Sequence, residues 1–203
     1  MALYLFLKKI GCTPKVIVPN DFPAFLSWMP YIEDVVIYDK NTECARTLMC
    51  EAELFCYLDF NVPSRTGIMH NDLCRFNKTP KILIDHHIGA NSSDFVACYS
   101  ETNISSTSEM VAEVVMHQGV DKYIDTDIAT NLLVGMITDT GSFSHSVFEN
   151  TFKICGDLLT VSGVNYRTIH QNIYDNSSEN RLRLLGFLIN NRMEVLKEFK
   201  TAF

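Results

Sequence analysis

The chain has 203 residues, 47% of them hydrophobic and 20% charged, which is enough for one substantial core. Its net charge of −7, with no basic stripe, excludes a protein that binds duplex DNA or other polyanions through Lys and Arg alone. No stretch is long and apolar enough to cross a bilayer, and the N-terminus is apolar first and basic after, the reverse of a secretory signal; we therefore expect a cytoplasmic protein with no membrane partner.

Short apolar runs separated by turns occupy the first half of the chain. They are nearly continuous instead of alternating with polar residues, which is typical of strands buried on both faces in a parallel sheet covered by helices. The predicted strands are residues 15–18, 34–38, 53–58, 81–84 and 94–99.

The second half has the periodicity of helices. Ser106 and Glu109 have the spacing of a capping box at the start of one helix. Asn176 and Glu179 are a second capping candidate, and apolar residues follow it at steps of three and four as far as Leu196. Between these two lies a segment with a clear apolar face, made by Ile128, Leu132, Leu133 and Met136. Strands with intervening helices predict an α/β fold, a parallel sheet flanked by helices.

The seven cysteines are scattered, odd in number and without a C-x-x-C pair. This pattern disfavours a disulfide framework and a zinc site. We expect reduced thiols, mostly buried, as suits a cytoplasmic protein.

Potential metal ligands follow two of the predicted strands. Asp59 comes after one strand, and Asp85, His86 and His87 come directly after another, in the sequence KILIDHH. Because ligands bind beyond the carboxyl ends of parallel strands in open sheets, these groups should converge on one crevice. Asp139 ends an apolar helical segment, before a glycine-containing turn, and is a further candidate.

Carboxylates combined with imidazoles form a ligand set for a moderately hard divalent cation. Mn²⁺ fits such a mixed set well, and Mg²⁺, Fe²⁺ or Co²⁺ are alternatives. A pair of such ions would polarise phosphoryl oxygens and would let an acidic protein bind an anionic substrate. The ligand set therefore predicts hydrolysis of a phosphoester.

Simpler interpretations exist for the single residues. Asp59 or Asp139 alone would be more typical of a helix cap or a turn. The run 85–87, directly after a buried strand, favours a functional site over a surface turn. Arg65 is either a phosphate contact or part of a surface turn, and His145 is close enough to Asp139 in sequence to line the same cleft.

The motifs together resemble those of a known family. LIDHH, preceded by YLDFN and followed by SSTSEMV and GMITDTGSF, resembles the DHH phosphoesterase superfamily. Over essentially its whole length the chain is similar to the short-oligoribonucleotide hydrolases that also dephosphorylate phosphoadenosine phosphate, some of which are described as exopolyphosphatase-related. The resemblance implies a metal-dependent phosphoesterase acting on short oligoribonucleotides or small nucleotide phosphates through a metal-bound hydroxide.

The resemblance also implies roles for the matching residues. Asp59 would bridge two Mn²⁺ ions, and His86 and Asp139 would bind one of them. His87 would face the scissile phosphate, orienting it or serving as an acid. Asp85 would hold the imidazoles in their working tautomer. The turn before the next helix, interpreted as structural, contains Ser105 and Ser106.

Two elements implied by the resemblance do not occur in these residues. Family members begin with a strand and a His-x-x-Pro-Asp-x-Asp motif that supplies further metal ligands, whereas Met1 corresponds to a position in the following helix. They also carry a C-terminal DHH-associated domain with a Gly-Gly-Gly-His motif. We therefore interpret residues 1–203 as an incomplete DHH phosphoesterase domain, with weakened metal and substrate binding.

Other functions stay open at this point. The chain could be a catalytically inactive fragment that binds a nucleotide or a protein. It could also be a DHH phosphodiesterase for another substrate, such as a cyclic dinucleotide, polyphosphate or pyrophosphate. A homodimer is one further alternative for its assembly.

Overall fold

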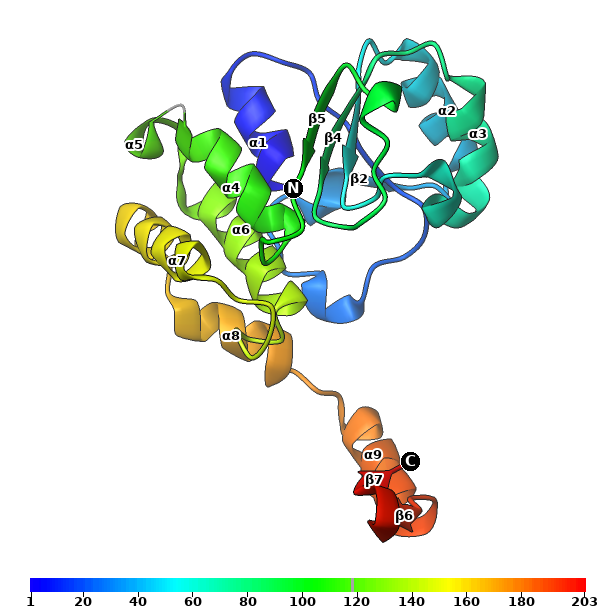
Figure 1. The fold of residues 1–203 in the computed structure, drawn as a ribbon, viewed down its shortest axis with the longest axis vertical. Helices are drawn as coiled ribbons and strands as arrows, with labels where there is room; N and C mark the ends of the chain where they lie inside the picture. Colours follow the sequence, from blue (N-terminus) through cyan, green and yellow to red (C-terminus); the bar gives the residue numbers. More distant parts are fainter. Residues whose placement is uncertain (118) are drawn as a thin grey trace.

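In the computed structural model, which describes residues 1–117 and 119–203, short parallel strands form two sheets at the centre of the molecule (Figure 1). One sheet pairs β1 (Val16–Val18) with β2 (Val35–Ile37). The other has the order β3-β4-β5, with β3 (Phe55–Leu58), β4 (Lys81–Asp85) and β5 (Ala97–Ser100). Each of these pairs is parallel, so the predicted α/β fold with parallel strands is confirmed.

The strands depart from the prediction in two ways. The single predicted sheet is divided, because among the described residues β1 is hydrogen-bonded only to β2, and β3 only to β4. One edge of β1 and one edge of β3 therefore have no strand partner within that part of the chain. The prediction that the strands are buried on both faces is wrong for β5, which is the outer strand of its sheet and exposes three of its four residues.

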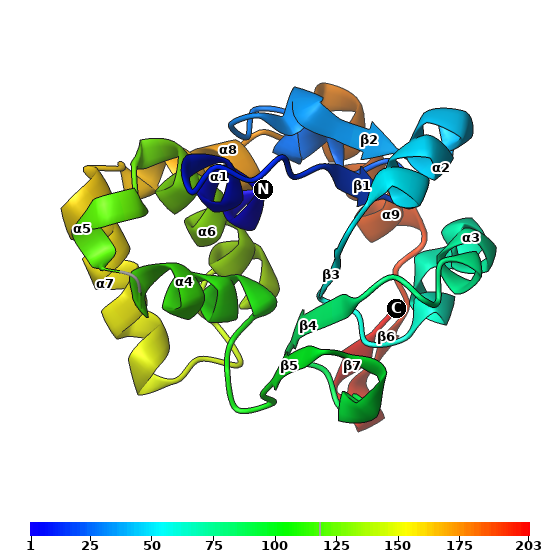
Figure 2. The ribbon, with the colours of Figure 1, turned by 90° about the horizontal axis from the view of Figure 1, so that it is seen from above.

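The larger core, which includes Ile84 of β4, lies between the β3-β4-β5 sheet and a group of helices. Figure 2 shows these helices on one side of the sheet. These helices are α1 (Ala2–Lys9), α4 (Thr107–His117) and α6 (Thr126–Asp139). The predicted apolar face of α6 is confirmed, since its side chains are completely buried: Ile128, Leu132, Leu133 and Met136. The core is thus built around α6.

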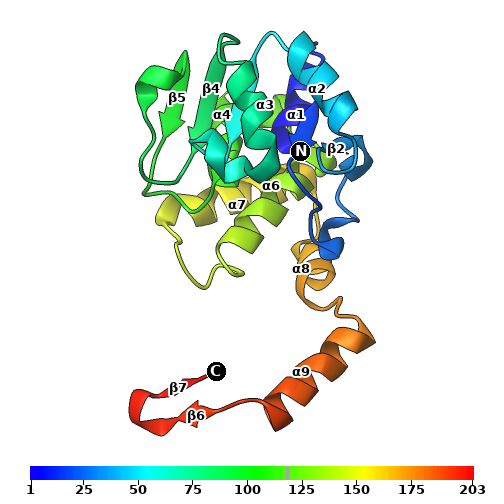
Figure 3. The same ribbon diagram turned by 90° about the vertical axis from the view of Figure 1, so that its right-hand side faces the viewer.

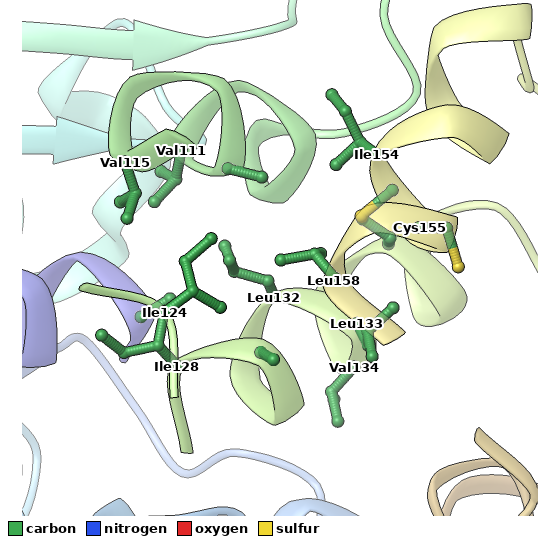
Figure 4. Packing of buried hydrophobic residues seen from close by; sticks show 14 of the residues in the cluster. Val111, Val115, Ile124, Ile128, Leu132, Leu133, Val134, Ile154, Cys155 and Leu158 are labelled. Carbon is green, nitrogen blue, oxygen red and sulfur yellow. The ribbon is translucent and has the colours of Figure 1, made fainter. Parts of the chain in front are cut away.

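Two further helices pack on the outer side of α6. These are α7 (Glu149–Ser162) and α8 (Tyr166–Tyr174), which the apolar periodicity did not single out. Figure 4 shows Leu158 of α7 beside Leu132 and Leu133 of α6. α6 is therefore enclosed by other helices along its length.

A second cluster lies on the opposite face of the β3-β4-β5 sheet, under α2 (Thr42–Glu51) and α3 (His70–Arg75) (Figure 2). Leu83 packs here, whereas its neighbour Ile84 packs in the larger core. Successive side chains of a strand point to opposite faces, so β4 joins the two cores. Both faces of this sheet are therefore covered.

A buried carboxylate stabilises the second cluster. Asp72 of α3 is 1% exposed and accepts hydrogen bonds from the Tyr38 hydroxyl, from Arg46 Nε at 2.6 Å and from Arg75 at 2.9 Å. The Tyr38 hydroxyl and then the Arg46 guanidinium hold the pKa of Asp72 below its ordinary value of 3.8. This carboxylate ties α3 to α2 and to the residue that follows β2.

The predicted capping box of α4 forms only in part. The Ser106 hydroxyl accepts a hydrogen bond from the Glu109 backbone N–H at 3.1 Å, as a cap should. The Glu109 carboxylate, however, accepts from the backbone N–H of Ser105 at 3.2 Å and from the Ser105 hydroxyl. It also accepts from the Thr151 hydroxyl of α7 at 2.7 Å. Glu109 is 1% exposed and so links α4 to α7 inside the core.

A C-terminal arm projects away from this body, as Figures 1 and 3 show. It consists of α9 (Glu179–Asn191) and an antiparallel hairpin of β6 (Val195–Leu196) and β7 (Thr201–Ala202). The predicted cap Asn176 is wrong. The cap is Ser178, whose hydroxyl accepts from the Arg181 N–H at 3.3 Å.

The apolar side chains of the arm are exposed. Its helix ends at Asn191, so the predicted stripe does not continue along one helix as far as Leu196. No residue of α9 is buried. The exposed apolar residues of the arm include Leu182, Leu185, Phe187, Leu188, Ile189, Met193, Val195, Leu196 and Phe199.

The remaining elements are short. They are η1 (Ala24–Leu26), η2 (Ile32–Asp34), η3 (Pro63–Met69), η4 (Ser92–Asp94), α5 (Val120–Tyr123) and η5 (Lys197–Phe199). Across the described residues, the structure contains no helix with both the length and the apolar character that a membrane crossing requires.

The expectation that the cysteines are mostly buried is wrong. Cys155 of α7 is buried and Cys56 of β3 is partly buried, whereas five thiols are exposed. Those five lie on the outer sides of short helices, on the edge strand β5 or in a loop: Cys12, Cys44, Cys50, Cys74 and Cys98. All seven are free thiols, as predicted.

Candidate metal centre

Asp59 directly follows β3 and bends the chain sharply. Its backbone is left-handed, with a φ of 68°, a conformation that costs ~1–3 kcal/mol in a residue other than glycine. Its N–H donates a hydrogen bond to the Ile84 carbonyl at 3.1 Å, which holds the bend against the end of β4. Strain of this kind is concentrated at functional sites, where the surrounding structure enforces it.

His86 and His87 follow β4 at the same edge of the sheet. In the parallel pairing of β3 with β4, Leu58 lies opposite Ile84, so the residues after both strands come together. His86 Nε2 lies 3.5 Å and His87 Nδ1 lies 3.8 Å from Asp59 Oδ1. The potential ligand atoms of Asp59, His86 and His87 all lie within 4.8 Å of one another. The structure thus brings together these residues from two strand ends.

Asp139, the last residue of α6, reaches the same place from the helical side. Its Oδ2 lies 3.3 Å from His86 Nε2. It therefore contacts the cluster, although the close group of three ligand atoms consists of Asp59, His86 and His87. Burial raises the pKa of the Asp139 carboxyl above 3.8, the Asp59 carboxylate adds to the rise, and His86 opposes it.

A close approach of two helices places Asp139. The Ser108 hydroxyl of α4 donates to the Leu132 carbonyl of α6 at 2.9 Å. One turn further along α6, a Cβ on Gly135 would lie 2.6 Å from the Cβ of Ser108, closer than real side chains approach. Glycine at this position is therefore required for α6 to approach α4 closely and bring Asp139 to the cluster.

Asp85 supports His87 from inside the protein. Asp85 is completely buried, and its Oδ1 lies 2.7 Å from His87 Nδ1. A carboxylate can only accept, so this contact assigns the ring proton to Nδ1 and leaves a lone pair on Nε2 of the neutral ring. Within the described residues, Oδ2 of Asp85 has no hydrogen-bond partner. A buried carboxylate oxygen normally has one, so this atom suits an additional donor or a cation.

The donor set of this cluster fits a divalent cation. It combines carboxylate oxygens with imidazole nitrogens, the mixture that moderately hard divalent ions accept. A cavity of about 240 Å³ adjoins the cluster, and its lining includes Asp59, Thr107 and Asp139. The chain therefore offers both ligands and space for an ion at the carboxyl edge of β3 and β4.

Three further residues had a weaker signal in the sequence or none. The Thr107 hydroxyl donates to Asp59 Oδ1 at 2.8 Å. The sequence did not indicate this contact, because threonine is an ordinary residue at the start of a helix. His145 is exposed in the turn after α6, and its charge opposes the rise in the pKa of Asp139. Arg65 lies exposed in η3.

Fold and site together define a parallel α/β domain with a carboxylate–imidazole centre at the ends of its strands. The chain belongs to the DHH family: the model of the DHH family, N-terminal domain, matches residues 1–136. The resemblance to this family is thereby confirmed, and the matched residues include Asp59 and His86, whereas Asp139 lies beyond them.

A solved structure agrees with this assignment. An exopolyphosphatase-related protein from Bacteroides fragilis is 37% identical, with a TM-score of 0.92 over 99% of this chain. The chain spans 58% of that protein's length. A putative family II inorganic pyrophosphatase from Methanococcus jannaschii is 21% identical, with a TM-score of 0.46 over 59% of this chain and 40% of the other; this likeness is too weak to bear on function. The comparison with curated proteins found no match.

Proposed function

We propose that this chain is the catalytic domain of a metal-dependent phosphoesterase that hydrolyses short oligoribonucleotides or small nucleotide phosphates. The observation that carries the proposal is the convergence of Asp59, His86 and His87, whose ligand atoms lie within 4.8 Å of one another. Membership of the DHH family supports the reaction class. The choice of short oligoribonucleotides or small nucleotide phosphates as substrates rests on the resemblance of the sequence motifs.

Asp59, His86 and Asp139 are the proposed metal ligands, with Mn²⁺ as the preferred ion and Mg²⁺ as an alternative. A bound divalent ion would polarise a phosphoryl oxygen and lower the pKa of a water molecule. It would also offset the net charge of −7, which otherwise repels an anionic substrate.

His87 is the proposed contact to the scissile phosphate. The bond from Nδ1 to the buried Asp85 orients the ring and leaves Nε2 for the phosphate. A protonated His87 can donate a proton from Nε2 to the leaving oxygen, while Asp85 keeps the ring in place. Asp85 therefore acts on the reaction through His87.

The proposal is tested by assaying the purified chain with Mn²⁺ against a ribodinucleotide, phosphoadenosine phosphate and inorganic polyphosphate. We expect release of mononucleotide or phosphate that stops when EDTA removes the ion. Asp59→Asn and His86→Ala should abolish this activity, because each removes a proposed ligand.

Asp94→Asn and His117→Ala are matched controls. Both change the same residue types at exposed positions outside the cluster, and both should keep the wild-type rate. Activity that survives Asp59→Asn or resists EDTA would contradict the proposal. Failure on every substrate by a folded, Mn²⁺-bound chain would favour the alternative, a catalytically inactive fragment that binds nucleotide.

Polyphosphate is in the assay because of one specific observation. The similar protein from Bacteroides fragilis is described as exopolyphosphatase-related, and the likeness extends over 99% of this chain. Polyphosphate is therefore the second candidate substrate. Selective release of phosphate from polyphosphate would replace oligoribonucleotides in the proposal and leave the metal centre unchanged.

A further inference from the structure

Asp59 is the one member of the close cluster that is both exposed and held in a strained backbone. Its side chain is 56% exposed, compared with 19% for His86 and 34% for His87. Its carboxylate therefore lacks the tight packing that would fix its rotamer. A carboxylate that binds a cation beside two imidazoles must nevertheless be oriented, because ligand groups misplaced by a fraction of an ångström bind the cation poorly.

Thr107 provides that orientation. Its hydroxyl donates to Asp59 Oδ1 at 2.8 Å, the same oxygen from which the distances to His86 and His87 are 3.5 and 3.8 Å. One hydroxyl thus fixes the oxygen that lies nearest to both imidazoles. Hydroxyl-to-carboxylate bonds of this kind are stronger than neutral ones, since the acceptor is charged.

The donor itself is held rigidly. Thr107 is 7% exposed and is the first residue of α4, whose start is capped by Ser106. Ser105 before it is bound by the buried carboxylate of Glu109. The next residue, Ser108, is bonded to α6. The Thr107 hydroxyl is therefore attached to the core, whereas the carboxylate that it contacts is at the surface.

We propose that Thr107 is a positioning residue that holds the Asp59 carboxylate toward His86 and His87 and so raises the affinity of this centre for a divalent cation. The inference rests on the proposed metal centre. It assigns a function to the first residue of α4, directly after the turn that was interpreted as structural, and it adds a residue from α4 to a site otherwise built from strand ends and α6.

The test compares the wild type with Thr107→Val, which keeps the shape of the side chain and removes the donor. Mn²⁺ binding is measured from the electron paramagnetic resonance signal of the free ion. We expect Thr107→Val to weaken Mn²⁺ binding roughly tenfold, and Thr107→Ser to restore it to within about twofold, because the hydroxyl returns. Thr107→Ala should behave as the valine variant does and replaces it if the valine variant does not fold.

Thr151→Val is the matched control. Thr151 of α7 is completely buried and donates to the carboxylate of Glu109 in α4 at 2.7 Å. Thr151→Val therefore removes a hydroxyl-to-carboxylate hydrogen bond to α4 that does not involve Asp59. We expect this variant to lose stability and to keep wild-type Mn²⁺ affinity. Equal weakening in both variants would show a general effect of loosening α4 and would overturn the inference.

A second measurement, without metal, separates this inference from the proposed function. Three-bond couplings in NMR spectra report the χ1 rotamer of Asp59. We expect one rotamer in the wild type and in Thr107→Ser, and averaging in Thr107→Val. A single rotamer in Thr107→Val would overturn the positioning role. Absence of Mn²⁺ binding by the wild type would contradict the proposed function, and the rotamer would still decide the role of Thr107.

Discussion

Helices α6 and α9 have similar lengths, 14 and 13 residues, and carry two and four leucines, yet their surroundings are opposite. Leu132 and Leu133 of α6 are completely buried, whereas Leu182 and Leu185 of α9 are 56% and 53% exposed. α6 is packed against α1, α4, α7 and α8, and no residue of α9 is buried. Apolar periodicity therefore predicts that a helix forms, and neighbouring elements decide whether its apolar face is covered.

The largest expected difference between the two helices is in backbone protection. Amides of α6 should exchange only through global unfolding, while those of α9 should exchange by local opening, because few buried contacts hold that helix. Hydrogen–deuterium exchange of peptides from residues 126–139 and 179–191 should differ on the order of a thousandfold or more. Comparable protection would show that the arm is covered in solution.

Truncating one leucine in each helix sharpens the comparison. Leu133→Ala should lower the free energy of unfolding by ~2–5 kcal/mol, because it opens a cavity in the larger core. Leu185→Ala should change it by less than about 0.5 kcal/mol, because its side chain already meets water. Denaturant unfolding measures both values. A large loss for Leu185→Ala would contradict the exposed position of the arm.

Substitutions of charged residues should also change the free energy of unfolding more in the body than in the arm, by smaller amounts than the leucine substitutions. Asp72→Asn should cost ~1–3 kcal/mol, because it weakens a buried acceptor that serves Tyr38, Arg46 and Arg75. Glu179→Gln removes the pair with Arg183 at 2.7 Å on the arm, where both side chains are 75% exposed. That change should cost less than about 0.5 kcal/mol. Equal losses of unfolding free energy in chemical denaturation would show that charged contacts in the body and in the arm contribute equally to stability.

Acid should weaken the body through Asp72. Its pKa is lower in the folded chain than the ordinary 3.8, so below pH 3.8 the unfolded chain binds more protons at this residue. The stability that Asp72 contributes is therefore present above that value and is lost as the pH falls through the lower folded pKa. As the pH is lowered from 5 through 3.8, the melting temperature should fall less steeply for Asp72→Asn than for the wild type, as thermal unfolding at each pH would show.

Local sequence patterns predicted the strands and α6 well, because short apolar runs and helical faces depend on neighbouring residues. The convergence of Asp59 with His86 was also predictable, since parallel strands end at one edge. The division of the sheet, the exposure of the arm and the contact from Thr107 to Asp59 were not. They depend on packing between segments far apart in the chain, which periodicity does not record.

The centre at the strand ends is tested most directly by a crystal grown with Mn²⁺ and measured at the manganese absorption edge. We predict an anomalous peak within coordination distance of the Asp59 carboxylate and the His86 imidazole. A peak at another place in the chain, or none at saturating Mn²⁺, would contradict the assignment of Asp59 and His86 as ligands.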